Sequence, residues 1–244
     1  MPTDIHCAQC PLRQLRTFAD INAEETAFLT EFRQRQVTIP AGKSIIGEGG
    51  RRSELYSLFG GWAFRFRTLS DGRRQILNFL LPGDFIGLQA QMAEKSPHGV
   101  EALTDATLCA FPRDRLWDLY RLCPSLGYDI TWINAYEELI VDENLLSVGR
   151  RSALERIAML LIHLYKRAES VGLGGPNGVP LPINQQHIAD ALGLSLVHTN
   201  KTLRRLREYG MYELANGHLR LGDLAAMQKL ADYYALPLRR RPLV

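Results

Sequence analysis

The residues of this chain whose type could carry chemistry are four cysteines. Cys7 and Cys10 are separated by two residues, whereas Cys109 and Cys123 each stand alone. A Cys-x-x-Cys pair suits a metal ion or a thiol redox couple, but the spacing alone is a weak signal. Cysteines in apolar stretches also serve as small buried side chains. Three interpretations stay open: a metal site, thiol redox sensing, and no chemistry at these thiols.

Motifs typical of enzymes are missing from the sequence. It has no Gly-x-Ser-x-Gly turn around a nucleophile and no His-Glu-x-x-His zinc motif. The Gly-rich segment 172–178 lacks the Lys and the Ser or Thr of a phosphate-binding loop. The six histidines do not share a metal-binding spacing. We therefore expect a protein that is not an enzyme.

The most informative segment is 184–209, where two short helices are predicted on either side of Gly193. Asn184 can cap the first helix and Ser195 the second, and the glycine permits a sharp turn between them. The inward faces are Ile188, Ala189 and Leu192 in the first helix and Thr199, Leu203 and Leu206 in the second. Segment 210–221 follows as two strands around an Asn-Gly turn. Together they predict a winged helix-turn-helix; the alternative is a three-helix packing unit without a DNA role.

The outward face of the second helix is the surface that a recognition helix lays in a DNA major groove. Val197 and Lys201 lie one turn apart near its N-terminus, so we assign them to base edges: Lys201 can donate to guanine, and Val197 can pack on a thymine methyl. Polar neighbours are better suited to phosphates. The whole predicted interface is Gln185, Gln186, Ser195, Leu196, Val197, His198, Asn200, Lys201, Arg204 and Arg205.

Two further regions must position these residues. Segment 37–111 reads as short β segments separated by turns such as Ser70-Asp71-Gly72, which predicts an antiparallel roll or barrel without excluding a sandwich. A long helix is predicted over 126–146, and a second, amphipathic helix over 151–168.

The long helix carries a stripe with alternate spacings of three and four residues. Its members are Ile130, Ile133, Glu137, Ile140 and Asn144. An apolar seam interrupted by polar residues suits a helix paired with its own copy, where the polar positions fix the register. We assign these five residues to dimerisation; the alternative is a helix packed on its own domain.

Composition narrows the class of protein. The apolar content of 46% is ordinary for a globular chain, and no uncharged apolar run is long enough for a membrane span. The first residues do not resemble a secretory signal, and the cysteines are too few for a disulfide framework, so we expect a cytoplasmic protein. Segment 180–244 holds nine Lys and Arg against five Asp and Glu, a weak indication of nucleic-acid contact.

Over nearly its whole length the chain resembles the CRP/FNR superfamily, in its FNR/FixK-like branch. The resemblance rests on Leu81–Gly87 (LPGDFIG), on the predicted seam helix, and on Ile188–Ser195 with its wing. It implies an α+β fold with an N-terminal cyclic-nucleotide-binding-type β-roll, a long dimerisation helix and a C-terminal winged helix-turn-helix. The implied boundaries are 1–20 for a cysteine-containing segment, 21–124 for the roll, 125–148 for the dimerisation helix and 149–244 for the DNA-binding domain.

The resemblance also implies partners. It indicates a homodimer on double-stranded DNA, with two recognition helices about one turn apart and hence an inverted-repeat site. RNA polymerase is implied as a partner, as for an activator. Family members read bases from the positions of Leu196, Val197 and Lys201, but they typically carry Glu at 197 and Arg at 201. An altered or more loosely read half-site is therefore expected.

The signal is less well defined. The cyclic-nucleotide branch has a Glu where this chain has Leu88, and an Arg followed by a hydroxyl residue where it has Ser96-Pro97. Without that cation a cyclic phosphate would be buried unpaired, so cyclic AMP is not expected. The FNR branch holds an iron–sulfur cluster, and Cys7, Cys10 and Cys109 match three of its four ligand positions. The remaining position is Arg16, and the substitutes that the sequence offers are His6 and Cys123.

We therefore predict a sequence-specific transcriptional regulator controlled by a signal at its N-terminal half, with redox or oxygen among the candidates. The cofactor is unknown; a cluster at Cys7, Cys10 and Cys109 is one alternative. A changed packing of the long helix near Glu137 and Asn144 is the expected switch. The alternative function is a small-ligand or nucleotide-binding effector module with a degenerate DNA-binding domain.

Overall fold

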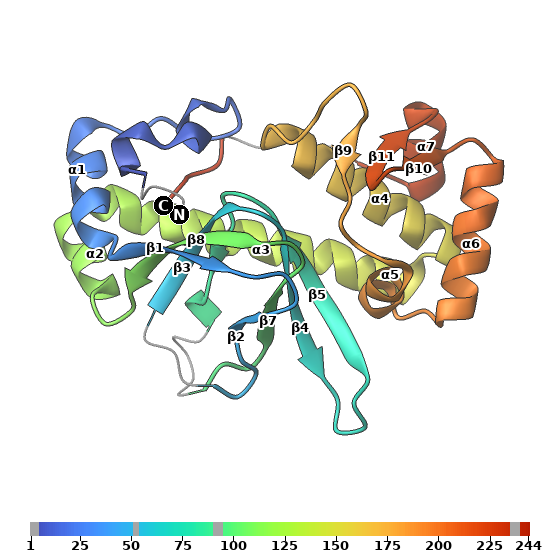
Figure 1. The fold of residues 1–244 in the computed structure, drawn as a ribbon, viewed down its shortest axis with the longest axis horizontal. Helices are drawn as coiled ribbons and strands as arrows, with labels where there is room; N and C mark the ends of the chain where they lie inside the picture. Colours follow the sequence, from blue (N-terminus) through green and yellow to red (C-terminus); the bar gives the residue numbers. More distant parts are fainter. Residues whose placement is uncertain (1–4, 51–53, 90–94, 235–239) are drawn as a thin grey trace. The chain divides into compact units, whose positions relative to one another are not determined.

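The computed structural model of the chain describes residues 5–50, 54–89, 95–234 and 240–244 (Figure 1). The chain divides into two compact units. The first comprises Met1–Arg67, Leu80–Glu138 and Leu238–Val244, and the second comprises Thr68–Phe79 and Leu139–Pro237. Among the described helices, none is both long enough and apolar enough to cross a bilayer.

The first part of the chain forms the predicted β-roll. Two short 3-10 helices, η1 (Cys7–Gln9) and η2 (Pro11–Gln14), precede α1 (Ala23–Phe32). The strands are β1 (Arg35–Ile39), β2 (Ser44–Ile46), β3 (Glu54–Gly60), β4 (Ala63–Thr68), β5 (Arg74–Leu80), β6 (Phe85–Ile86), β7 (Gly99–Ala102) and β8 (Ala106–Pro112). They lie in two sheets, with strand orders β1-β8-β3-β6 and β2-β7-β4-β5. Two helices follow, α2 (Leu116–Leu122) and α3 (Pro124–Arg150).

Alternation along β8 decides where its cysteine lies. Ala106, Leu108 and Ala110 are buried in the core between the sheets, since successive side chains of a strand point to opposite faces. Cys109 therefore lies on the other face, where it packs against the apolar cluster that contains Leu29 of α1. This places a thiol beside the N-terminal segment.

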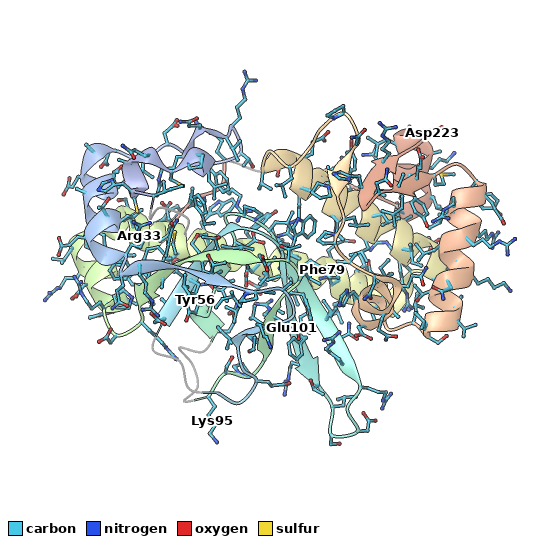
Figure 2. All side chains as sticks on the ribbon, in the orientation of Figure 1. Arg33, Tyr56, Phe79, Lys95, Glu101 and Asp223 are labelled. Carbon is cyan, nitrogen blue, oxygen red and sulfur yellow. The ribbon has the colours of Figure 1, made fainter. Side chains whose placement is uncertain are left out.

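The second unit contains the predicted winged helix-turn-helix. It includes α4 (Ala153–Ser170), β9 (Val179–Pro180), α5 (Gln185–Leu192), α6 (Leu196–Glu208), β10 (Tyr212–Ala215), β11 (His218–Leu221) and α7 (Leu224–Ala231). Ser152 and Glu155 form a capping box that begins α4. The strands form one antiparallel sheet in the order β10-β11-β9, and Asp223, labelled in Figure 2, caps α7.

The predicted seam of α3 packs on its own chain. Ile130 and Ile133 are 1% and 4% exposed in the core cluster of the first unit. Glu137 is buried too and pairs with Arg65 at 2.8 Å. Asn144 donates to the carbonyl of Leu77 in the second unit. Side chains that are enclosed by their own chain leave no surface for a partner. Ile130, Ile133 and Glu137 therefore follow the alternative, a helix packed on its own domain, and not the predicted dimerisation role.

The chain's last residues differ from the predicted domain boundary. Leu238–Val244 belong to the first unit, although the sequence assigned 149–244 to the DNA-binding domain. The backbone N–H of Arg241 donates to Thr17, and its carbonyl accepts from Ala19. Its guanidinium pairs with Asp84 at 2.8 Å. A short segment without apolar periodicity gives no sequence signal for such docking.

Candidate nucleic-acid interface and cysteine pocket

Local capping builds the helix-turn-helix as predicted. The Asn184 side chain accepts from the N–H of His187 at 2.9 Å and thereby begins α5. Gly193 ends α5 in the left-handed conformation with φ of +63°. The Ser195 hydroxyl accepts from the N–H of His198 and begins α6. The three predicted cap and turn residues therefore set the entry of the second helix.

The inward face of α6 is confirmed and is one residue wider than predicted. Thr199, Leu203 and Leu206 are buried, and so is Thr202. The Thr202 hydroxyl donates to the carbonyl of His198, one turn earlier, which allows this polar residue to lie inside. A threonine at this spacing gives no sequence signal for burial.

The outward face of α6 divides into two halves. At its N-terminal half Val197 is 79% exposed, and Lys201 makes no side-chain hydrogen bond or ion pair within the described part of the chain. At its C-terminal half Arg204 pairs with Glu208 at 2.9 Å, and Arg205 donates to the Tyr209 hydroxyl at 2.7 Å. The N-terminal half thus offers the side chains with fewer competing contacts.

A groove of about 710 Å³ opens beside this N-terminal half. Its lining is Ser152, Ala153, Leu154, Ser195, Val197, His198, Lys201, Thr202 and Arg205. The N-termini of α4 and α6 both meet it, and helix N-termini present unpaired N–H groups and partial positive charge. With Lys201 and Arg205 added, the groove suits anions such as the phosphates of a nucleic acid.

Four residues that line the groove (Ser152, Ala153, Leu154 and Thr202) are not in the predicted interface, and half of the predicted interface lies outside the groove. Ser152 was missed, although its spacing to Glu155 indicates a helix start, because only the fold brings that start next to Ser195. Five exposed residues of the predicted interface do not line the groove: Gln185, Gln186, Leu196, Asn200 and Arg204. The structure therefore gathers about half of the predicted interface at one place.

The part of the β4–β5 hairpin that belongs to the second unit, Thr68–Phe79, contacts α5 within that unit. Arg74 of the hairpin pairs with Asp190 of α5 at 3.1 Å, and Gln75 donates to the carbonyl of Ala191 at 2.9 Å. The wing turn holds Asn216 and Gly217 at positive φ, as expected for an Asn-Gly hairpin. The hairpin contacts were not predicted, since the partners are more than 100 residues apart.

Three of the four cysteines meet in a second cavity, which lies in the first unit. Cys7, Cys10 and Cys109 line a space of about 30 Å³. The other lining residues are Ile5, Leu12, Arg13, Leu29, Arg33, Gln36, Ser57, Phe59, Phe111, Leu243 and Val244. Arg33, labelled in Figure 2, follows α1 and lies 4.0 Å from the Cys109 sulfur. Burial raises the pKa of the Cys109 thiol above its usual value.

The donor set of this cavity does not fit a four-iron cluster held by four thiolates. Cys123 lies in the apolar core beside the Ser125 hydroxyl, and His6 lines a different cavity. Arg13 lines the space instead of a fourth acidic or sulfur ligand. Across the described residues, no three His, Cys, Asp or Glu side chains are grouped as a metal site. The assignment of Cys7, Cys10 and Cys109 to a metal stays a prediction without a fourth ligand.

The positions that bind cyclic nucleotides in the related branch are filled by other contacts. Leu88 is 9% exposed and packs in the core cluster. The Ser96 hydroxyl is buried and donates to the carbonyl of His98 at 2.7 Å. Neither position supplies a cation for a cyclic phosphate.

Comparison with known proteins gives the same two-part organisation. Residues 36–122 match the cyclic nucleotide-binding domain, and residues 155–230 match the Crp-like helix-turn-helix domain. The transcriptional activator protein FnrL of Cereibacter sphaeroides is 30% identical over 93% of this chain and 92% of its own length. The nitrogen fixation regulation protein FixK of Bradyrhizobium diazoefficiens is 29% identical over 94% and 95%.

A solved structure has the same fold as this chain. FixK2 from Bradyrhizobium japonicum superposes with a TM-score of 0.71 and 25% identity, covering 83% of this chain and 98% of that one. These relatives are transcription regulators, which agrees with the prediction that the chain is not an enzyme. With a β-roll, a long helix and a winged helix-turn-helix in this order, and relatives matched almost from end to end, the chain belongs to the CRP/FNR family of DNA-binding transcriptional regulators.

Proposed function

We propose that the chain acts as a homodimer on an inverted-repeat promoter site and reads that site with the N-terminal half of α6. The observation that carries the proposal is the groove where Val197 and Lys201 stand exposed beside two helix N-termini. An exposed apolar side chain next to an amine without a competing partner is the combination needed for a thymine methyl and a guanine. Leu196, 42% exposed, is the third base contact that we propose.

Phosphate contacts position α6 over the bases. The first turns of α4 and α6, which begin beside Ser152 and Ser195, donate to phosphate oxygens of one strand, together with the side chains of His198 and Arg205. Gln185 and Gln186 at the start of α5, together with Asn200 and Arg204, extend the same contact beyond the groove. Because several cations and dipoles meet phosphates, affinity should fall steeply with salt.

Dimerisation uses the exposed side of α3 in this proposal. Ala135, Leu139, Asp142 and Leu146 are exposed and follow each other at spacings of four, three and four residues. Leu139 and Leu146 are 46% and 47% exposed, so they can form the apolar contacts of a paired helix. Ile140 and Asn144, the remaining members of the predicted stripe, flank this seam.

The names of the relatives indicate which step such a regulator controls, the start of transcription. FnrL is named a transcriptional activator, and we propose that this chain likewise contacts RNA polymerase in the bacterial cytoplasm, where promoter DNA lies. The signal acts on the first unit, and cyclic AMP is not the effector that we propose because Leu88 and Ser96 replace the residues that would hold it.

Selection from a random duplex library with the purified protein tests the proposal. We expect an inverted repeat with half-site centres about 34 Å apart, and a complex containing two protein chains. Lys201→Ala should weaken binding about 10- to 100-fold, whereas Lys229→Ala, which removes an exposed amine from α7, should not. A library without enrichment, or equal loss in both variants, would contradict the proposal.

A further inference from the structure

The N-terminal segment is fixed directly over Cys109. The backbone N–H of Ile5 donates to the Gln36 side chain at 3.2 Å, and its carbonyl accepts from Arg33 at 2.7 Å. The same two side chains lie 3.7 and 4.0 Å from the sulfur of Cys109. Since Gln36 and Cys109 face each other in the β1–β8 ladder, this arrangement is set by strand register. Cys7, two residues after Ile5, is thereby held against the same space, which it lines.

The cavity that the thiols line is small. At about 30 Å³ it has room for one or two water molecules and for a molecule of similar size. The Cys7 thiol contacts the Leu29 carbonyl, 3.9 Å from its sulfur, and Leu29 also lines the cavity. Cys7 and Cys109 therefore face one confined space from two different segments.

Arg13 supplies hydrogen-bond donors to this space. Its Nε and Nη1 atoms are buried and have no hydrogen-bond partner among the described residues. A buried donor without an acceptor is unfavourable, and an oxygen atom arriving in the cavity would satisfy it. A thiol is a weak hydrogen-bond acceptor, so the reduced cysteines satisfy the Arg13 donors poorly. An oxygen atom, either of a bound small molecule or attached to a cysteine sulfur, would accept from them better.

We propose that this pocket is a thiol oxidation site in which hydrogen peroxide links Cys7 to Cys109 by a disulfide. One thiol attacks the peroxide, gives a sulfenic acid and releases one water molecule. The second thiol then attacks that sulfur, which forms the S–S bond and releases a second water. Two thiols are oxidised by two electrons and one peroxide is reduced, so no metal is needed. Arg13 donates to the peroxide and to the sulfenic oxygen.

The same pocket touches the end of the chain that leaves the DNA-binding unit. Leu243 and Val244 line it, and their segment is fixed by the Arg241–Asp84 pair and by Arg240 with Asp20 at 2.6 Å. This segment follows α7 in the sequence. Oxidation therefore occurs against a segment that continues from the helix-turn-helix domain. The regulatory consequence, an altered operator affinity, rests on the proposed function.

The test uses the full-length protein, reduced and purified without oxygen, then treated with an equimolar amount of hydrogen peroxide. We expect the loss of two thiols and a non-reduced peptide pair that joins the N-terminal tryptic peptide to the peptide of Cys109. Cys7 and Cys10 share one tryptic peptide, so single variants assign the bond. Cys7→Ser and Cys109→Ser should abolish it, whereas Cys10→Ser and the matched control Cys123→Ser should retain it. Oxidation should change the Kd for the selected operator at least threefold in wild type and leave Cys7→Ser unchanged.

Three outcomes of the peroxide experiment would overturn the inference. They are a Cys7–Cys10 disulfide with Cys109 still reduced, no disulfide at all, and a disulfide that leaves the Kd unchanged. Stoichiometric iron and sulfide in the anaerobic protein, lost in Cys109→Ser, would overturn it in favour of a cluster. DNA binding by the reduced protein is scored separately: its absence would count against the proposed function, while peptide mapping still decides the disulfide.

Discussion

The outward face of α6 and the cysteine pocket are assembled in opposite ways. The α6 face comes from one contiguous stretch, Ser195–Arg205, and its N-terminal side chains project into an open groove. The pocket brings together five segments between Ile5 and Val244 around a space with room for one or two water molecules. Substitutions on the exposed face should alter binding and spare folding. Substitutions in the first unit, which encloses the cysteine pocket, should alter the stability of the fold or the reactivity of the thiols.

The largest effect is expected inside the unit that holds the pocket. Arg65→Met leaves Glu137 buried without its cationic partner and with only the Gln89 amide donating to it, although burial already raises the pKa of that carboxyl. Breaking one side of a buried pair costs about 3–5 kcal/mol of unfolding free energy. Replacing both residues by Met should restore stability to within about 1–2 kcal/mol of wild type, since no charge is left unpaired. Denaturant unfolding measures both variants.

The same double variant sharpens the assignment of α3. If Glu137 packs only within its own chain, Arg65→Met with Glu137→Met should sediment as the same oligomer as wild type. A dissociated double variant would return Glu137 to the dimer seam. A single variant as stable as wild type would show that the pair is not buried as described.

On the exposed face the effect should appear in binding alone. Lys201→Glu places a negative charge against phosphates and bases, so operator affinity should drop about 100-fold. The unfolding free energy should change by no more than about 0.5 kcal/mol because the side chain is solvent-exposed. Lys229→Glu is the control with the same charge change. An equal loss of operator affinity in both variants would mean that only the net charge of the protein matters. The contrast between the exposed face and the pocket would then disappear.

Acid should destabilise both units through one histidine each. Burial, then neighbouring arginines, lowers the pKa of His98 in the first unit and of His163 in the second to about 4. An unfolded histidine takes up its proton near pH 6.5, so the unfolded chain binds more protons between about pH 6.5 and 4. The free energy of unfolding that each buried neutral histidine contributes is therefore fully present above about pH 6.5 and is lost as the pH falls. The loss should amount to roughly 1–2 kcal/mol per histidine at pH 5. His163→Gln should make the DNA-binding unit less pH-sensitive; an unchanged profile would contradict the burial of His163.

The smallest expected effect concerns the turn between α5 and α6. Gly193→Ala has room for the added methyl, since its nearest neighbour is Val148 at 3.7 Å. The cost is conformational, because φ of +63° is unfavourable for alanine, and it should amount to about 1 kcal/mol. Thermal unfolding would measure it. A loss well above this value would indicate that the turn packs more tightly than the structure describes.

The sequence predicted what local rules control. Asn184, Gly193 and Ser195 set the helix-turn-helix through caps and a left-handed turn, and each depends on neighbours within four residues. The stripe at Ile130 and Ile133 was correctly identified as apolar, but periodicity does not tell whether such a stripe faces its own domain or a second copy. When a long helix has two apolar sides, its sequence does not show which side pairs with a second copy of the chain.

Non-local features could not be predicted in the same way. The approach of Ser152 to Ser195, the Arg74–Asp190 pair and the docking of Arg241 each join residues far apart in the sequence. Cys109 was recognised as a candidate from the family pattern, but its neighbours Gln36 and Arg33 follow only from strand register and from the end of α1.

Base reading by the N-terminal half of α6 is tested most directly by a change of specificity. The operator preference of Val197→Glu, selected from the same random library as wild type, would be compared position by position. We expect a changed base preference at one position in each half-site, related by the two-fold axis, with the other positions retained. Identical preferences for both proteins, at equal affinity, would contradict the placement of Val197 at the bases.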